Sequence, residues 1–327
     1  MEKLLKDTQA YRLLKKEYTE NACSHAYLLQ FGDGRNLRFA LKLLAKVLFG
    51  CDESGYLDEE EQRREKLIDE ESFSDCLFFP LPGKKLSVED AEIIREECLI
   101  SPVEGERKVI VIGDFAEANT QTQNKLLKLL EEPPQGVIFL LGATSSFSIL
   151  PTVLSRVKRL EIQPFDIEET AKCLARIYEG KADNKAIEFC AASSGGIVGE
   201  AQNIYEGGYH KTLTESVFEL CLANDAKLPL LLKQIGETKY KKELLSLIRI
   251  VFRDALLIKT GNGKAVLLRS EKERLTQVAV RYSAFALLRA QEEILEAEKQ
   301  VQFNAVFPQC LGLTISKIRK GSVTSLG

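Results

Sequence analysis

Residues 124–134 read Asn124-Lys-Leu-Leu-Lys-Leu-Leu-Glu-Glu-Pro-Pro134, and residues 150–157 read Leu150-Pro-Thr-Val-Leu-Ser-Arg-Val157. The leucines of the first run have helical spacing, and its two prolines end the helix because proline lacks the N–H group and clashes with the preceding turn. An apolar run over 137–141 separates the two segments and predicts a buried strand. This part of the chain therefore predicts a helix that leads into a strand of an α/β sheet.

The helix that ends at the two prolines is expected to begin near residue 120. Thr120 and Gln123 are its predicted caps, in the pattern of a capping box. Leu126, Leu127 and Leu130 form the apolar stripe that we expect to face the sheet.

Similar apolar runs alternate with helical patterns over the first half of the chain. The predicted strands cover 26–31, 76–81, 108–112, 137–141 and 159–162, and the predicted helices cover 2–20, 37–49, 88–99 and the segment from 120. Short apolar strands that alternate with helices predict a parallel sheet covered on both faces.

The strand signal disappears after residue 166. Helices are predicted at 167–180, 183–193 and 197–206, and longer helices follow to the end of the chain, including one that ends at Gly261 and one over 271–300. The chain thus divides into an α/β domain over 1–164, a small helical domain over 165–208 and a helical C-terminal domain over 209–327.

Bulk composition limits the classes of function. The 327 residues are 45% apolar and 28% charged, with a net charge of −3, so no strong positive field attracts nucleic acid. The eight cysteines include no CxxC pair, which favours buried thiols in a reducing compartment. The sequence shows neither a signal peptide nor an apolar run that could span a bilayer, so we expect a cytoplasmic location and no membrane partner.

Residues 25–31, 107–134 and 137–165 resemble the delta-prime family of subunits of the bacterial DNA polymerase III clamp loader, which belongs to the AAA+ superfamily. The runs 124–134 and 150–156 resemble that family's Leu-Leu-Lys-x-Leu-Glu-Glu-Pro and Leu-Pro-Thr-Ile-x-Ser-Arg signatures. The resemblance implies an AAA+ RecA-like α/β domain, then a helical lid domain, then an all-α collar domain that mediates oligomerisation.

The chain departs from active relatives where ATP phosphates are bound. A phosphate loop needs glycines for close backbone approach, a Lys and a Ser or Thr. The stretch Gly32-Asp-Gly-Arg-Asn-Leu-Arg-Phe39 keeps Gly32 and Gly34 but places Leu37 at the Lys position, with Arg35 nearby. We therefore interpret it as a degenerate P-loop.

Two further positions depart from the pattern of an ATPase. Gly113-Asp114 follows the strand 108–112 where the Walker B motif would place Asp-Glu, and Glu200 stands where relatives place an arginine in the lid. A glutamate there would repel a phosphate chain. We expect no nucleotide cofactor in this chain; the resemblance implies ATP and magnesium in the neighbouring subunits.

Ser155-Arg156 matches the family pattern. The resemblance implies that Arg156, supported by Ser155, acts in trans as an arginine finger on ATP bound by the next subunit. The alternative is an ordinary surface arginine at a strand edge. The family's cysteine after this arginine is Val157 here.

No metal site is predicted. Family members often carry a four-cysteine zinc module between the first helix and the second strand, but this segment has only Cys51 and Cys76, at its two ends. The acidic run 52–75 is either a solvated helix or a loop. The basic clusters 239–242 and 317–320 are interpreted as solvated helix ends, with contact to DNA backbone as the alternative.

The leading hypothesis is a non-hydrolysing scaffold subunit that supports loading of the sliding clamp on primed DNA. Its implied partners are the tau/gamma-type ATPase subunits and the delta subunit, with the clamp and primer-template DNA reached through the complex. The isolated chain is expected to have no activity, although it would be part of the DNA polymerase III holoenzyme. An active AAA+ ATPase with an atypical P-loop is the alternative, and it requires ATP binding that depends on Arg35 or Arg38. A third reading, a DNA-binding module acting alone, is disfavoured by the near-neutral charge.

Overall fold

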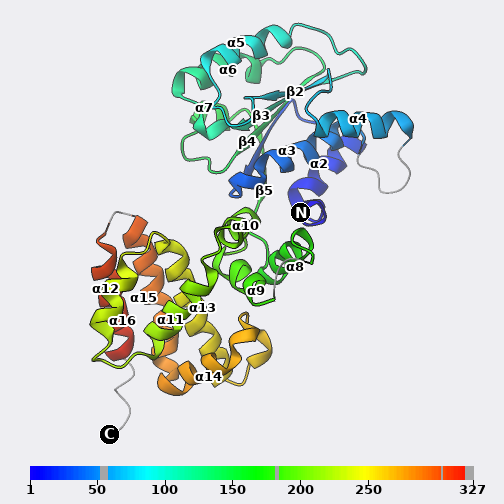
Figure 1. The fold of residues 1–327 in the computed structure, drawn as a ribbon. Helices are drawn as coiled ribbons and strands as arrows, with labels where there is room; N and C mark the ends of the chain where they lie inside the picture. Colours follow the sequence, from blue (N-terminus) through cyan, green and yellow to red (C-terminus); the bar gives the residue numbers. More distant parts are fainter. Residues whose placement is uncertain (52–57, 181–183, 303–304, 321–327) are drawn as a thin grey trace. The chain divides into compact units, whose positions relative to one another are not determined.

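The computed structural model describes residues 1–51, 58–180, 184–302 and 305–320 (Figure 1). The chain forms two compact units, Met1–Pro164 and Phe165–Gly327. The first unit contains a sheet covered by helices. The described part of the second unit contains helices.

A five-stranded parallel sheet forms the centre of the first unit. Its strand order is β2-β3-β4-β1-β5. The strands are β1 (Ala26–Phe31), β2 (Cys76–Phe79), β3 (Lys108–Asp114), β4 (Val137–Ala143) and β5 (Lys158–Ile162). All four pairings are parallel, and the central strand β4 is buried along its whole length. The apolar runs therefore have the composition of strands covered on both faces.

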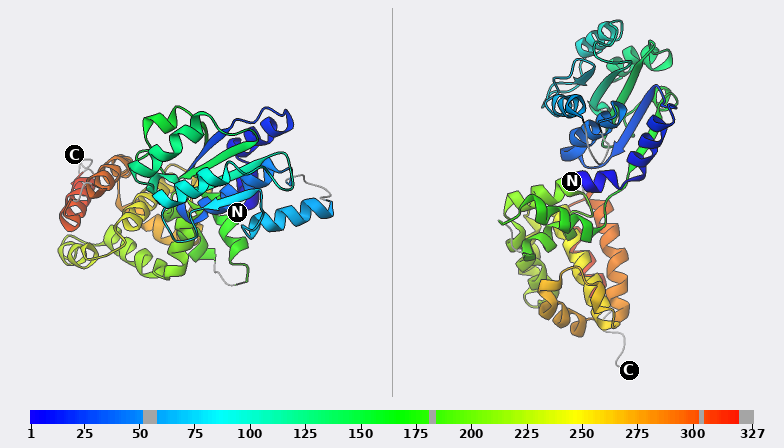
Figure 2. Two further views of the ribbon diagram at one scale, coloured as in Figure 1. Left: turned by 90° about the horizontal axis from the view of Figure 1, so that it is seen from above. Right: turned by 90° about the vertical axis from the view of Figure 1, so that its right-hand side faces the viewer.

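Helices cover both faces of this sheet, as Figures 1 and 2 show. One apolar core joins the sheet to α5 (Val88–Glu97), α6 (Thr120–Glu131) and α7 (Pro151–Leu154). The other face is covered by α3 (Gly34–Leu48), which packs against β3 and β4, with α2 (Gln9–Thr19) beside it. The predicted architecture, an α/β domain with a parallel sheet followed by helices, is confirmed.

Two helix starts differ from the prediction because side chains cap them in a different register. Asn119 caps α6 by accepting a hydrogen bond from the Thr122 N–H at 2.9 Å, so Thr120 is the first helical residue and not the cap. Asp33 caps α3, which therefore begins at Gly34, three residues before the predicted start. In both helices a single acceptor side chain fixes the boundary.

The N-terminal segment predicted as one helix over 2–20 is two helices. α1 (Glu2–Lys6) ends before Thr8, whose hydroxyl accepts from the Tyr11 N–H and so starts α2. The acidic run contains α4 (Glu59–Asp69), which a capping box between Asp58 and Glu61 begins. Residues 52–57 of that run lie outside the described residues.

The second unit consists, in its described part, of α-helices and two short 3₁₀ turns, η2 (Gly263–Ala265) and η3 (Arg269–Glu271). The helices are α8 (Ile167–Ile177), α9 (Asn184–Ser193), α10 (Val198–Gly207), α11 (His210–Leu222), α12 (Leu228–Gly236), α13 (Lys241–Lys259), α14 (Lys272–Arg281), α15 (Ala284–Gln302) and α16 (Phe307–Lys320). One apolar core runs from Leu174 to Ile318 through these helices. The finer division at residue 208 stays a prediction.

The helix predicted over 271–300 is divided between α14 and α15. Tyr282 has an extended backbone at the end of α14, and its hydroxyl donates to the Cys221 carbonyl at 2.9 Å. The Ser283 hydroxyl then accepts from the Ala286 N–H at 3.1 Å. The sequence prediction of one helix over 271–300 missed this break.

Candidate functional site

The residues predicted to matter lie at opposite ends of the sheet. We call residues 32–37, 113–114 and 144 the carboxyl end, because they follow the last residues of β1, β3 and β4. We call residues 131 and 155–158 the amino end, because β5 begins there and its first residue, Lys158, pairs with Tyr27 near the start of β1. The six residues of β1 separate the two ends by roughly 20 Å.

An internal carboxylate occupies the helix start at the carboxyl end. The side chain of Asp33 is 2% exposed, and its Oδ1 accepts from the Asn36 N–H at 3.1 Å. Its Oδ2 accepts from the Asn36 side chain at 2.8 Å. A helix N-terminus attracts anions, so this buried carboxylate takes the position that a phosphate group would need and repels a second anion.

Hydrocarbon fills the position of the missing lysine. Leu37 is 3% exposed and lies in the core under β4. A Cβ atom added at Gly142 would lie 3.2 Å from Leu37 Cδ1 and 2.7 Å from Leu41 Cδ1, which shows how closely both leucines pack on that strand. A lysine ammonium at residue 37 would therefore be desolvated among apolar atoms.

Arg38, one of the two arginines on which the alternative ATPase reading could depend, is bound within its own unit. Its Nε and Nη2 donate to the two carboxylate oxygens of Glu71 at 2.6 and 2.5 Å, and its Nη1 donates to the Pro80 carbonyl at 2.9 Å. Lys42 Nζ lies 2.9 Å from the same carboxylate. The hydrogen bond from Arg38 holds the pKa of Glu71 below its usual range.

The structure brings Asp114 and Gly34 close to Thr144. The Asp114 carboxylate accepts from the Thr144 hydroxyl at 2.9 Å and from the Thr144 N–H at 3.3 Å. A Cβ atom at Gly34 would lie 3.3 Å from the Thr144 methyl carbon. Gly113 adds no side chain beside Asp114, and the Asp114 carboxylate is already hydrogen-bonded to Thr144.

Arg156 lies in the turn between α7 and β5, at the amino end. Its Nη1 donates to the Thr152 carbonyl at 2.6 Å and lies 3.1 Å from the Ser155 Oγ. Its Nη2 forms an ion pair with Glu131, the last residue of α6. The side chain is 32% exposed, so solvent still reaches the guanidinium. The Ser155 hydroxyl and the Arg156 guanidinium are thus in contact.

Gln123 holds the segment that leads to Arg156, a role that sequence reasoning missed. The side chain is 1% exposed. Its Nε2 donates to the Ala118 and Ser148 carbonyls at 3.0 Å each, and its Oε1 accepts from the Leu150 N–H at 2.9 Å. It joins α6 to the start of α7 instead of capping α6. A glutamine on the apolar side of a helix was the only signal in the sequence.

The predicted lid position and the cysteines are the remaining candidates for a functional role. Glu200 lies on α10, and its Oε1 is 3.1 Å from Lys242 Nζ. Cys51 and Cys76 are buried, and burial raises the pKa of the Cys51 thiol to about 11 and the pKa of Cys76 further. No group of three or more His, Cys, Asp or Glu side chains with the arrangement of a metal site occurs within the described ranges.

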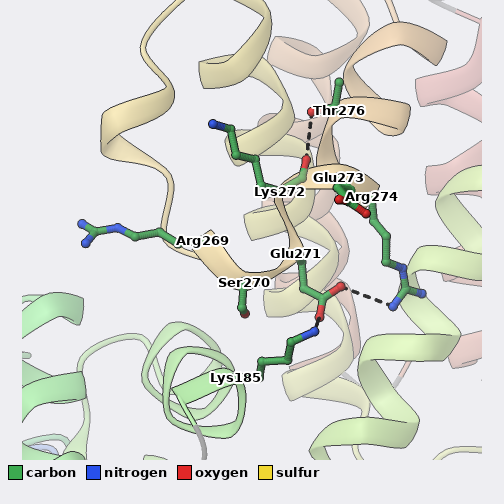
Figure 3. A pocket seen from close by; sticks show the side chains of 8 residues that line it. All are labelled: Lys185, Arg269, Ser270, Glu271, Lys272, Glu273, Arg274 and Thr276. Atoms are coloured by element: carbon green, nitrogen blue, oxygen red, sulfur yellow. Dashed lines mark hydrogen bonds and ion pairs between the residues drawn. The ribbon is translucent and has the colours of Figure 1, made fainter.

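A hollow of about 670 Å³ lies in the helical unit (Figure 3). Its lining comes from the start of α9 and from η3 and α14. Glu271 pairs with Lys185 at 3.4 Å and with Arg274 at 3.5 Å. Glu271 thus offsets part of the positive charge that Lys185 and Arg274 bring to the hollow. Of the helices that the structure describes, none is both long and apolar enough to cross a membrane.

Comparisons with known proteins show similarity to subunits of DNA polymerase III. Residues 6–166 match the family model described as "DNA polymerase III, delta subunit". The chain is 24% identical over 306 residues to DNA polymerase III subunit delta' of Bacillus subtilis, covering 90% of each chain. It is 26% identical over 277 residues to subunit tau of the same organism, covering 77% of this chain and 48% of tau.

Among solved structures, a DNA polymerase III gamma-subunit-related protein of Thermotoga maritima matches with a TM-score of 0.43 and 18% identity, over 96% of this chain and 100% of that one. A TM-score of this size carries no argument about function. The sequence matches support the resemblance seen in residues 124–134 and 150–156: residues 6–166 are similar to the DNA polymerase III delta-subunit family, and 90% of the chain is similar to subunit delta' of Bacillus subtilis.

Proposed function

We propose that this chain is the delta-prime subunit of a bacterial replicative clamp loader, a scaffold that does not hydrolyse ATP and that donates Arg156 in trans to ATP held by a neighbouring subunit. Its partners are the tau/gamma-type ATPase subunits and the delta subunit. The sliding clamp and primer-template DNA are reached through the complex, which works in the cytoplasm. Residues 209–327 supply the collar contacts that hold the assembly together.

The position of Arg156 is the observation that carries this proposal. It lies at the amino end of the sheet, and its chain's own degenerate P-loop lies at the carboxyl end, roughly 20 Å away across the strands. A guanidinium acts on a phosphoryl group only at hydrogen-bond distance. Arg156 therefore suits a nucleotide presented by another chain.

The carboxyl end supports the other half of the proposal. Asp33 caps the helix that would receive phosphate, Leu37 replaces the lysine with buried hydrocarbon, and Asp114 has no second carboxylate beside it. These three features also disfavour the alternative of an active ATPase with an atypical P-loop. Arg38, one of the two arginines on which that alternative could depend, is bound to Glu71.

The chemistry that Arg156 would supply is electrostatic. In the neighbour, the bond between the γ-phosphorus and the oxygen of ADP breaks while the oxygen of water bonds to that phosphorus. Negative charge builds on the phosphoryl oxygens, and a fixed guanidinium stabilises it without accepting or giving a proton. Ser155 orients the guanidinium through its contact with Nη1.

The test is Arg156→Ala in a reconstituted clamp loader. ATP turnover should fall by about one to three orders of magnitude, because the transition-state charge loses its partner. Assembly, measured by size-exclusion chromatography, should be unchanged. Arg159→Ala is the matched control, since Arg159 is an exposed arginine on β5. Equal turnover in the Arg156→Ala and wild-type complexes would remove the finger assignment.

A further inference from the structure

The guanidinium of Arg156 is held by three groups of its own chain. Nη2 is paired with the carboxylate of Glu131, while Nη1 faces the Thr152 carbonyl and the Ser155 hydroxyl. Two of these groups belong to the turn that carries Arg156. Glu131 belongs to a different element, the end of α6, and it is the ionised partner among the three.

Helix stability does not account for a glutamate at this position. The last turn of a helix carries partial negative charge, so a carboxylate there is unfavourable, whereas Arg156 offsets that charge. The Glu131 side chain is 43% exposed, and exposed ion pairs of this kind contribute little to folding. The pairing therefore fits a role in controlling Arg156 better than a role in stability.

We propose that Glu131 is an intramolecular counter-ion that holds Arg156 in the unassembled chain and releases it to the terminal phosphoryl group of ATP on the neighbouring subunit. This inference rests on the function proposed above. Glu131 is thus a positioning residue that acts through Arg156. We call the pair the Glu131–Arg156 clasp.

The charges at the two competing sites give the clasp its selectivity. A carboxylate and the terminal phosphoryl group of ATP both offer oxygens that match the guanidinium fork, but the carboxylate carries one negative charge and the phosphoryl group carries more. ADP lacks that group. A half-exposed ion pair shifts the equilibrium between the paired and the detached Arg156 side chain by about two- to fivefold. The clasp is therefore weak enough for ATP to displace Glu131. It is also strong enough to lower the fraction of chains in which Arg156 is detached from Glu131.

The first test measures the clasp without any partner. Phenylglyoxal modifies accessible arginine side chains, and mass spectrometry gives the rate at Arg156 in the isolated full chain. Glu131→Gln should raise that rate about two- to fivefold, because the neutral amide holds the guanidinium less tightly. Glu132→Gln, which removes one charge at the next exposed position, should leave the rate unchanged. An equal or slower rate at Arg156 in the Glu131→Gln chain would overturn the clasp.

The second test measures the consequence in the reconstituted clamp loader. Glu131→Gln should raise ATP turnover in the absence of clamp and DNA by about two- to fivefold, and Glu132→Gln should not. The increase should disappear in the Arg156→Ala background, where no finger remains to be released. A lower turnover with Glu131→Gln would show that Glu131 supports the working geometry, and it would overturn release.

The two tests separate this inference from the proposed function. If Arg156→Ala leaves turnover unchanged, the finger assignment and the release step both fall, while the modification rate still decides whether the clasp exists. If Arg156→Ala lowers turnover and Glu131→Gln changes neither measurement, the finger stands and the clasp falls.

Discussion

The carboxyl and amino ends of the sheet use their charged groups in opposite ways. At the carboxyl end, Asp33 and Asp114 are hydrogen-bonded to their own unit, and Leu37 closes the space beside them. At the amino end, Arg156 is partly exposed and is held through a weak ion pair. Different segments of the chain build the two ends, so the charged groups of one end can be bound internally while a charged group of the other end stays accessible to solvent.

The largest expected effect breaks the comparison by restoring the P-loop lysine. Leu37→Lys should lower the free energy of unfolding by about 2–4 kcal/mol, because the ammonium replaces hydrocarbon packed against Leu41 and Gly142. Chemical denaturation gives the stability, and ATP titration of the isolated chain gives the affinity. Neither wild type nor variant should bind ATP in the micromolar range, since Asp33 still occupies the helix start.

Leu37→Met is the control for this change, because it keeps the volume and should cost under about 1.5 kcal/mol. A Leu37→Lys chain as stable as wild type, with micromolar affinity for ATP, would mean that the carboxyl end is still an open phosphate site. The contrast between the two ends would then rest on one residue and not on the whole packing arrangement.

A smaller effect on stability is expected from changing Gln123, which supports the segment that leads to the amino end. Gln123→Ala removes three hydrogen bonds and leaves the Ser148 carbonyl and the Leu150 N–H without their partner, which should cost about 1–3 kcal/mol. Hydrogen exchange at the Leu150 amide should become faster. Asn124→Ala, at the exposed next position, should stay within about 0.5 kcal/mol of wild type. Unchanged exchange at Leu150 would show that this segment is fixed by other contacts.

Local sequence patterns predicted the bounds of an element well where only one signal marked its ends. The strand at 26–31 has the predicted bounds because an apolar run and a following glycine define it. Boundaries failed where a second polar side chain competed to be the cap, as Asn119 does with Thr120 and Thr8 does inside the predicted 2–20 helix. Periodicity describes which face of a helix is apolar, and several acceptors can serve the same helix start.

The candidate residues were found by motif, but their contacts were not. The Ser-Arg motif predicted Arg156, whereas its pairing with Glu131 joins positions 25 residues apart in two different helical segments. The same holds for Gln123 and Ser148. Such pairs depend on how α6 packs beside α7, which the spacing of apolar residues does not specify.

The smallest expected effect concerns the carboxyl end of the sheet and is a dependence of folding stability on pH. Glu71 accepts from Arg38 and lies beside Lys42, and the hydrogen bond from Arg38 holds its pKa below the usual value of about 4.3. A depressed pKa contributes stability above the unfolded value, and that contribution is lost as the pH falls through the folded value.

Glu71→Gln should therefore lower the free energy of unfolding by about 1 kcal/mol at pH 7, because the amide keeps an acceptor but loses the charge that Arg38 and Lys42 contact. Denaturation at several pH values should show this difference shrinking as the pH falls below the unfolded value of about 4.3, because Glu71 is then protonated first in the unfolded chain and, at lower pH, in the folded chain. Glu70→Gln, at the preceding exposed position, is the control and should show a flatter profile. A difference that persists unchanged at low pH would mean that Glu71 acts through packing, and that Arg38 is held by its bond to the Pro80 carbonyl instead of by charge.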